Sequence, residues 1–426
     1  MKQLKIFIGF LSVLAVLTFT ACNKDLEQFD DIVPPGPNPS PGLATALASN
    51  SNYSLYNAIV VKSGMSGTLN DSLRTLTMFV PTNAAVKQAI TALTMGQVPS
   101  GSPDAVYLGF INSANFTQAT AAGIVGYNAV PHKIDFAAIP QNFPNFQYPS
   151  LLNPAPQLSA LLRLTTFPSR TNGNFVNNVP ITSAAINAGN GIMFETGALV
   201  APPQRYLWDR ISTDPLMGYL KAAIQRADSG SVAGNPTSSL VAALQSIGAN
   251  LTVFAPSDAA FQATLYVLAY PSVRAAVYAQ YIAGGASTTT ANAMADAQAP
   301  AQTTALVSSP TVFSNPLLFS SLTAEKVKGV VVYHILGSRA FLNNLPATQA
   351  NYPTLLNSAI VSHPGVGLKV TMTGPMAVSA TVKGAVNASA ANVSINPTPE
   401  PGGSSDQHYT NGVLHKIDQV LLPMAF

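Results

Sequence analysis

The sequence contains few of the residue types on which many protein functions depend. It has a single cysteine, Cys22, in 426 residues, which excludes a disulfide framework and a cluster of cysteine metal ligands. Charged residues make up only 9% of the chain, against about 25% in average soluble domains. The formal net charge is +3, without the clustered basic footprint of nucleic-acid-binding proteins. We therefore expect no nucleic-acid partner, and a surface built mainly from Ser, Thr, Asn and Gln.

Motifs of catalysis and cofactor binding are also missing. The chain has no Gly-x-Ser-x-Gly turn, no His-Glu-x-x-His helix, no phosphate-binding loop with its lysine and no Gly-x-Gly-x-x-Gly after a strand. Glycoside hydrolysis needs two carboxylates flanking the bond. The acidic residues of the second half are scattered, among them Asp258, Glu325, Glu400, Asp406 and Asp418. We predict that the protein is not an enzyme and holds no cofactor and no metal.

An internal repeat determines the expected architecture. The segment 76–86 (LTMFVPTNAAV) closely resembles 251–261 (LTVFAPSDAAF), and their prolines, Pro81 and Pro256, are 175 residues apart. Two further pairs of blocks follow in the same order: 125–131 with 332–336, and 190–202 with 411–423. Collinear blocks at this offset indicate a duplicated domain rather than a solenoid. We predict a first domain over 43–203 and a second over 204–426.

Each copy is expected to place helices before strands, which is typical of α+β folds. The segments 53–61 and 207–220 are expected to be the opening helices. In the repeated block Pro256 ends a strand, Ser257 is a natural N-cap, and Asp258 lies in the first helical turn.

Later parts of the second copy carry strand and loop patterns. Alternation at Leu368, Val370 and Met372 predicts a half-buried strand, and Asn411-Gly412 predicts a hairpin turn. The additional segment 284–310 is rich in Ala, Ser, Thr and Gln. We expect it to be a surface insertion made mainly of loop with some helix.

The first 21 residues have the features of an export signal. Lys2 and Lys5 precede an apolar run over 6–18, and small residues lead to Cys22. The run is shorter than the about 20 residues that span a bilayer. The pattern resembles a bacterial lipoprotein signal, with Phe19 where Leu is usual, so lipid on Cys22 is expected to anchor the mature chain to the membrane.

Residues 22–42 are expected to form a tether, acidic at first and then a Pro-rich spacer. An acidic stretch directly after the cysteine resembles the address of Bacteroidetes-type lipoproteins for the outer face of the outer membrane. We therefore expect an outer membrane lipoprotein exposed on the cell surface, with the periplasmic face as the alternative.

The repeated blocks resemble the fasciclin (FAS1) family, most closely in the second copy, at 252–261, 330–336 and 411–423. The first copy is expected to be a divergent domain, because it departs from the pattern at Asn83, Val86, Asn128 and Phe194. The resemblance implies an α+β fold of two tandem domains, each a wedge-shaped β-sandwich with packed helices. It also implies adhesion through binding of extracellular proteins or glycans, with a contact near Tyr333 and His334.

The motif residues themselves are also expected to support the fold, as core anchors, caps or turn residues. They are Phe79, Pro81, Tyr127, Asn190, Gly191, Phe254, Pro256, Ser257, Asp258, Asn411, Gly412 and His415. His334 is expected to hydrogen-bond to Asp258 or Asp418. His408 and His415 flank the Asn-Gly turn, and nothing in the sequence supports a metal shared by them.

The sequence thus predicts a lipid-anchored binding protein at the cell surface, whose partner is an extracellular protein or polysaccharide. One alternative is a scaffold or accessory subunit of an outer-membrane glycan uptake or assembly complex. A second alternative is a glycan-active or ester hydrolase that uses a distant carboxylate pair.

Overall fold

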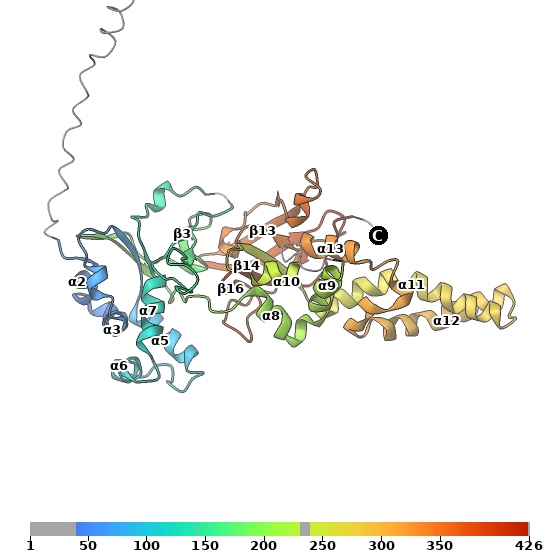
Figure 1. The fold of residues 1–426 in the computed structure, drawn as a ribbon, viewed down its shortest axis with the longest axis horizontal. Coiled ribbons are helices and arrows are strands. Elements are labelled where there is room, and N and C mark those ends of the chain that lie inside the picture. Colours follow the sequence, from blue (N-terminus) through green and yellow to red (C-terminus); the bar gives the residue numbers. More distant parts are fainter. Residues whose placement is uncertain (1–39, 142, 231–238, 425–426) are drawn as a thin grey trace, which may run out of the picture. The chain divides into compact units, whose positions relative to one another are not determined.

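The structure is a computed structural model that describes residues 40–141, 143–230 and 239–424. The predicted export signal and most of the predicted tether fall on residues 1–39, outside the described residues. From Pro41 onward the chain forms one compact unit, in which helices and small sheets are mixed, as an α+β fold requires (Figure 1). Within this described part, no helix is both long and apolar enough to cross a membrane.

The first copy begins with helices and ends with strands. Its helices are α2 (Leu43–Ala48), α3 (Ser54–Ser63), α4 (Ser66–Leu69), α5 (Asn83–Leu93), α6 (Asp104–Asn112) and α7 (Gln118–Tyr127), with 3-10 turns η1 (Ser51–Tyr53) and η2 (Phe136–Ala138). Its strands are β1 (Leu76–Pro81), β2 (Ala129–Val130), β3 (Tyr148–Pro149), β4 (Thr165–Thr166), β5 (Pro168–Ser169), β6 (Phe175–Val176), β7 (Val179–Pro180), β8 (Ile186–Ala188) and β9 (Gly191–Thr196).

The second copy has the same order of elements. Its helices are α8 (Leu207–Thr213), α9 (Gly218–Asp228), α10 (Leu240–Gln245), α11 (Asp258–Ala283), α12 (Thr288–Val307) and α13 (Ala324–Tyr333), with 3-10 turns η3 (Pro215–Met217), η5 (Pro310–Ser314), η6 (Pro316–Leu318), η7 (Leu342–Asn344) and η8 (Leu355–Ser358). Its strands are β10 (Leu251–Pro256), β11 (Ile335–Leu336), β12 (Ala350–Tyr352), β13 (Val366–Thr373), β14 (Met376–Lys383), β15 (Ala391–Asn392), β16 (Gln407–Tyr409) and β17 (Gly412–Ile417).

The predicted repeat is visible as two sheets with one topology. The strand order is β2-β1-β9-β8 in the first copy and β11-β10-β17-β16 in the second. In both, the strand of the first sequence block pairs in parallel with the closing strand, and Leu76 opposite Gly191 corresponds to Leu251 opposite Gly412. The three blocks recognised in the sequence therefore meet in one sheet in each copy.

Alternation along these strands creates two apolar layers. In β10, Leu251, Val253 and Ala255 pack with α8 to α11 and α13. On the other face, Phe254 packs between this sheet and the second sheet, β12-β13-β14-β15. The second copy is therefore a two-sheet sandwich with helices on one side. In the first copy the second layer is reduced to the short pairings β3-β4 and β5-β6-β7.

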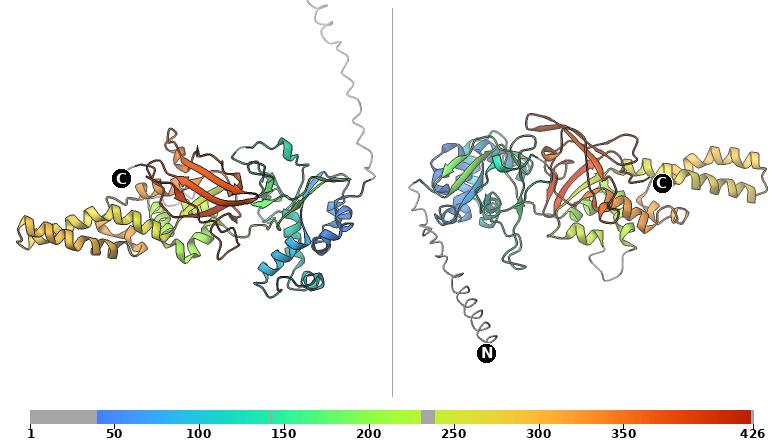
Figure 2. Two further views of the ribbon diagram at one scale, coloured as in Figure 1. Left: turned by 180° about the vertical axis from the view of Figure 1, so that it is seen from behind. Right: turned by 90° about the horizontal axis from the view of Figure 1, so that it is seen from above.

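The extra segment of the second copy is a helical hairpin, so our expectation of mainly loop over 284–310 is wrong. Helices α11 and α12 lie side by side and project away from the sheets (Figure 1, Figure 2). Ala291, Ala295 and Ala299 are fully buried at a spacing of four residues, which brings α12 close to Val273 and Val277 of α11. This helix was not predicted because its contact with α11 is made by small alanines and shows no stripe of large apolar residues. The alanines nevertheless favour a helix, since alanine has the highest helix propensity.

The opening helices also differ from expectation. The predicted helix over 207–220 is divided between α8 and α9, because Pro215 disfavours helical conformation at Asp214. In the first copy the predicted helix over 53–61 corresponds to α3, and α2 precedes it. Helix α2 is the counterpart of α8, because the Leu43 and Leu207 amides both donate to the buried motif asparagine of their copy.

Side chains of the two copies contact each other within the compact unit. The guanidinium carbon of Arg339 lies 4.6 Å from the ring centroid of Phe167, and Phe167 also packs on Phe341. Asn343 donates to the Asn177 carbonyl at 3.1 Å, and Asn344 donates to Ser169 Oγ at 2.6 Å. The loop after β11 and turn η7 thus form the face of the second copy that binds the first.

Candidate functional site

The Tyr-His pair lies inside the second copy, at the end of α13. Tyr333 and His334 are 0% and 2% exposed, so neither side chain offers a contact to a partner. The Tyr333 hydroxyl donates to the Gly365 carbonyl at 2.6 Å and accepts from the Ala385 amide at 2.8 Å. The pair that the family resemblance implied for binding therefore connects α13 to the second sheet.

His334 uses both ring nitrogens in the interior. The Leu421 amide donates to Nε2 at 2.8 Å, so Nδ1 carries the hydrogen and donates to the Val330 carbonyl at 2.8 Å. Burial lowers the pKa of His334 to about 4, although the Val330 carbonyl favours the charged form. The expected partners are wrong: Asp258 accepts from the Tyr219 amide, and Asp418 accepts from Asn392.

The first copy makes the same connections with different residues. Its Tyr127 hydroxyl donates to the Thr165 carbonyl at 3.0 Å. Asn128, the counterpart of His334, donates to the carbonyls of Ile124 and Val200, both at 2.8 Å. A neutral amide can replace the histidine here because the site requires hydrogen bonds rather than a charge.

The remaining motif residues hold helices against the sheet. Asn411 is fully buried; its side chain accepts from the Leu207 amide at 3.0 Å and donates to the Leu244 carbonyl at 2.8 Å. In the first copy Asn190 accepts from the Leu43 amide at 2.9 Å and donates to the Leu69 carbonyl at 2.9 Å.

The repeated block caps the following helix in both copies. Ser257 accepts from the Ala260 amide, and Thr82 accepts from the Ala85 amide. Next to them, Asp258 and Asn83 each accept from the first turn of a neighbouring helix at 3.0 Å. The strands before the caps end at buried Pro256 and Pro81.

The glycine after each of these asparagines permits a close approach of the strands. A Cβ on Gly412 would lie 2.5 Å from the Leu251 carbonyl oxygen, and one on Gly191 would lie 2.1 Å from that of Leu76. The predicted hairpin is present, with Tyr409 opposite Gly412. Its turn residues are Thr410 and Asn411, and Gly412 already belongs to the strand.

The two histidines near this turn are engaged separately. His415 is buried and stacks on Phe254 at 5.7 Å, as Phe194 stacks on Phe79 at 6.4 Å in the first copy. His415 Nε2 bonds the Ala340 carbonyl at 2.9 Å, whereas His408 Nε2 faces Arg339 Nη1 at 2.8 Å. Among the described residues, no group of three potential ligands could hold a metal ion.

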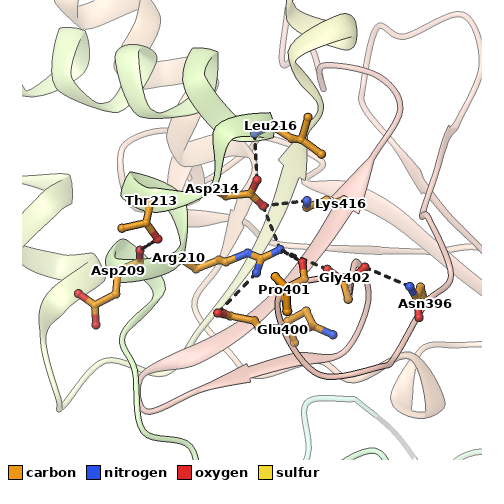
Figure 3. Close-up of polar contacts among 12 residues, drawn as sticks. Asp209, Arg210, Thr213, Asp214, Leu216, Asn396, Glu400, Pro401, Gly402 and Lys416 are labelled. Atoms are coloured by element: carbon orange, nitrogen blue, oxygen red, sulfur yellow. Dashed lines mark hydrogen bonds and ion pairs between the residues drawn. The ribbon is translucent and has the colours of Figure 1, made fainter. Parts of the chain in front are cut away.

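One cluster of charged side chains gathers carboxylates that are far apart in the sequence. Figure 3 shows Arg210 of α8 between Asp214 and Glu400. Arg210 Nη2 lies 2.9 Å from Asp214 Oδ2, and Lys416 Nζ lies 2.8 Å from the same oxygen. Glu400 is also paired with Arg205 and accepts from the Tyr409 hydroxyl.

The Asp214 carboxyl of this Arg210 cluster does not have the raised pKa expected of a catalytic acid. Burial alone would raise the pKa of Asp214, but the hydrogen bonds from Lys416 and Leu216 and the charges of Lys416 and Arg210 together lower it. Arg210 also donates to the carbonyls of Pro401 and Gly403 at 3.1 and 3.4 Å. The cluster therefore fixes the Pro-rich loop before β16 onto α8.

An open groove lies on the first copy, beside turn η2 and strands β8 and β9. It has a volume of about 480 Å³, within the range of about 300 to 1,000 Å³ typical of small-molecule sites. Its lining combines exposed polar residues (Lys133, Asp135, Asn174 and Asn187), the partly exposed Ser183, and buried apolar residues (Phe136, Ile192 and Phe194). The groove was not predicted from the sequence because its residues come from four separate segments and form no motif.

The segment of the chain that forms the groove resembles a known protein family. Residues 51–197 match the family model of the Fasciclin domain. The matched segment contains β1 to β9 and the groove, and it falls on the copy that we expected to be divergent. The second copy repeats its sheet order, register and buried hydrogen bonds.

Comparison with solved structures found a FAS1 domain pair from the insect cell adhesion molecule Fasciclin I. The sequence identity is 14%, the match covers 89% of this chain and 95% of that chain, and the TM-score is 0.29. No curated protein matched the sequence.

Proposed function

We propose that this protein is a lipid-anchored, cell-surface binding protein that recognises an extracellular protein or polysaccharide through its fasciclin-like copies and performs no catalysis. The observation that carries this proposal is a contrast between sites. The groove on the fasciclin domain is open and lined by exposed polar side chains. The Tyr333-His334 pair, its counterpart Tyr127-Asn128 and the Arg210 cluster are occupied by internal contacts.

The composition supports the same function. With only 9% charged residues, the surface offers mostly neutral hydroxyls and amides, which bind by hydrogen bonds that are little affected by salt. The sequence pattern around Cys22 supports a lipid anchor, and the acidic residues after it support the outer face of the outer membrane. The periplasmic face is the alternative.

Protease treatment of intact cells tests the location. An antibody to the second copy should detect cleavage of the native protein, whereas a periplasmic control protein should stay intact. Protection of the protein, alongside cleavage of a known surface protein, would place it on the periplasmic side.

A binding assay tests the function itself. Purified full-length protein in detergent should bind cell-surface polysaccharides or extracellular proteins saturably. Turnover of glycan or ester substrates that is abolished by Glu400→Gln would instead support a hydrolase.

The helical hairpin favours one second candidate, a scaffold or accessory subunit of an outer-membrane glycan uptake or assembly complex. Within the described residues such a hairpin occurs in the second copy alone, and its Val267 side chain is 73% exposed. A stoichiometric partner that co-purifies with the wild type and is lost in Val267→Lys would support the scaffold. A chain that purifies alone and still binds polysaccharide would support the binding protein.

A further inference from the structure

The groove of the first copy occupies the position that the second copy uses to bind the first. The Ile134 amide donates to Thr77 Oγ1 at 2.8 Å, and the Ala340 amide donates to Thr252 Oγ1 at 2.8 Å. These equivalent bonds align Lys133 with Arg339, and η2 with η7. The pairings Asn187 with Ile192 and His408 with Val413 align β8 with β16.

The residues at these equivalent positions have opposite character. Where the second copy presents buried Phe341 to the first copy, the groove presents exposed Asp135. The bonding amides Asn343 and Asn344 correspond to Ala137 and Ala138, which cannot make those hydrogen bonds. The groove is therefore an interaction face that lacks the apolar anchor and the amides needed to bind another fasciclin-like domain.

We infer that the groove of the first copy is a binding site for an uncharged carbohydrate. This inference rests on the proposed binding function and specifies the ligand class of the same site. Three side chains carry it: Lys133, Asn174 and Asn187 are exposed, line the groove, and make no side-chain hydrogen bond or ion pair with another described residue.

The chemistry of these groups fits sugar hydroxyls. Each asparagine amide both donates and accepts, as a hydroxyl does, so one amide can satisfy one or two hydroxyls of a sugar. Asp135 uses Oδ1 to accept from the Ala137 amide at 2.9 Å, which fixes the carboxylate, while Oδ2 accepts no hydrogen bond from another described residue.

The charge balance selects an uncharged ligand. Lys133 and Asp135 line the same groove with opposite formal charges, so an anionic ligand would meet the carboxylate and a cationic one the ammonium group. A neutral sugar can accept a hydrogen bond from Lys133 and donate one to Asp135.

The floor of the groove is apolar and already ordered. Phe136 and Phe194 are buried to 7% and 6% exposure and meet edge to face, with ring centroids 4.9 Å apart. Because so little of either ring is exposed, the two rings give the groove an apolar floor and leave the polar side chains at its rim to make the main contacts with a ligand. A rigid floor reduces the entropy lost when a ligand binds.

Binding of neutral and anionic oligosaccharides tests the inference. The probes are maltohexaose, laminarihexaose and mannohexaose within a wider array of neutral glycans, together with a heparin hexasaccharide, and the protein is the full-length chain in detergent. We expect saturable binding to a neutral glycan that changes less than about twofold between about 50 and about 500 mM NaCl.

Two variants link the binding to the groove. Asn174→Ala combined with Asn187→Ala should weaken binding at least about tenfold, because two hydrogen-bonding groups are lost. Asp135→Phe introduces the residue of the second copy and should block the groove. Asn112→Ala, an exposed amide on α6 outside the groove, is the matched control and should bind as the wild type does.

Four results would overturn the inference. In the first, the protein binds only the heparin probe. In the second, it binds a neutral glycan but the groove variants do not weaken this binding. In the third, the chain self-associates and the groove variants abolish the self-association, and in the fourth it binds an extracellular protein but no neutral glycan. In the last case the proposed function stands, whereas absence of any binding to proteins or glycans would overturn both.

Discussion

Replacing Asn411 by alanine should strongly destabilise the second copy. The side chain is fully buried and connects α8 to the end of α10 through the Leu207 amide at 3.0 Å and the Leu244 carbonyl at 2.8 Å. In Asn411→Ala both backbone groups lose their partner in the interior. An unsatisfied buried group costs about 1 to 3 kcal/mol, so the free energy of unfolding should fall by about 2 to 6 kcal/mol.

The single tryptophan provides the assay, because Trp208 follows Leu207 in α8. Its fluorescence during urea unfolding reports the helix that Asn411 holds. If the free energy of unfolding falls by about 3 kcal/mol per M of urea, the urea concentration at the unfolding midpoint should decrease by about 0.7 to 2 M.

Matched variants separate the effect of this contact from a general effect of substitution. Gln280→Ala, on the exposed side of α11, should leave the midpoint unchanged. Asn190→Ala removes the equivalent contacts of the first copy and should cause a loss of similar size, measured by circular dichroism. If Asn411→Ala and Gln280→Ala had the same midpoint, the reasoning would be refuted.

Three further predictions concern other residues. Because burial lowers the pKa of His334 to about 4, below its unfolded value of about 6.5, the unfolded state binds the proton more tightly between these pH values. The free energy of unfolding should therefore be highest above about pH 6.5 and fall by about 3 kcal/mol toward pH 4. In the variant His334→Asn, which copies Asn128, urea titrations should show a smaller fall over the same pH range, and an equal fall would contradict the linkage. Gly412→Ala should lose about 1 to 3 kcal/mol through its clash with β10, while Gly329→Ala in α13, with open space around it, should gain about 0.5 to 1 kcal/mol. A gain in Gly412→Ala as well would show that the clash is relieved. Cys22→Ser should move the protein from the membrane fraction to the soluble fraction, and continued membrane association would reveal a second anchor.

The sequence predicted the central sheet well because its strands carry the repeated blocks. Pro256 and Ser257 end the strand and begin the helix as local rules require, and the alternation at Leu368 and Val370 corresponds to β13. Such features depend on a few neighbouring residues, so they can be read without tertiary information. The helix α12 was missed because its packing depends on α11 rather than on its own pattern.

The candidate site could not be predicted in the same way. The family resemblance pointed to His334 as a binding residue, yet both of its ring nitrogens are hydrogen-bonded to backbone groups of Val330 and Leu421. The groove residues Lys133 and Asn187 are ordinary surface residues in the sequence. Lys133 follows β2 and Asn187 lies in β8, so only the assembly of the sheet and of the loop after β2 brings them to one groove.

By itself the sequence determined the duplication, the α+β class, the low charge and the absence of familiar catalytic motifs, because these follow from composition and from short local patterns. The tertiary structure decided which residues remain accessible. Burial assigned Tyr333 and His334 to the interior, and the contact between the copies covered the face around Phe341 while leaving its counterpart at Asp135 open. Accessibility depends on long-range packing between segments, and no local pattern encodes it.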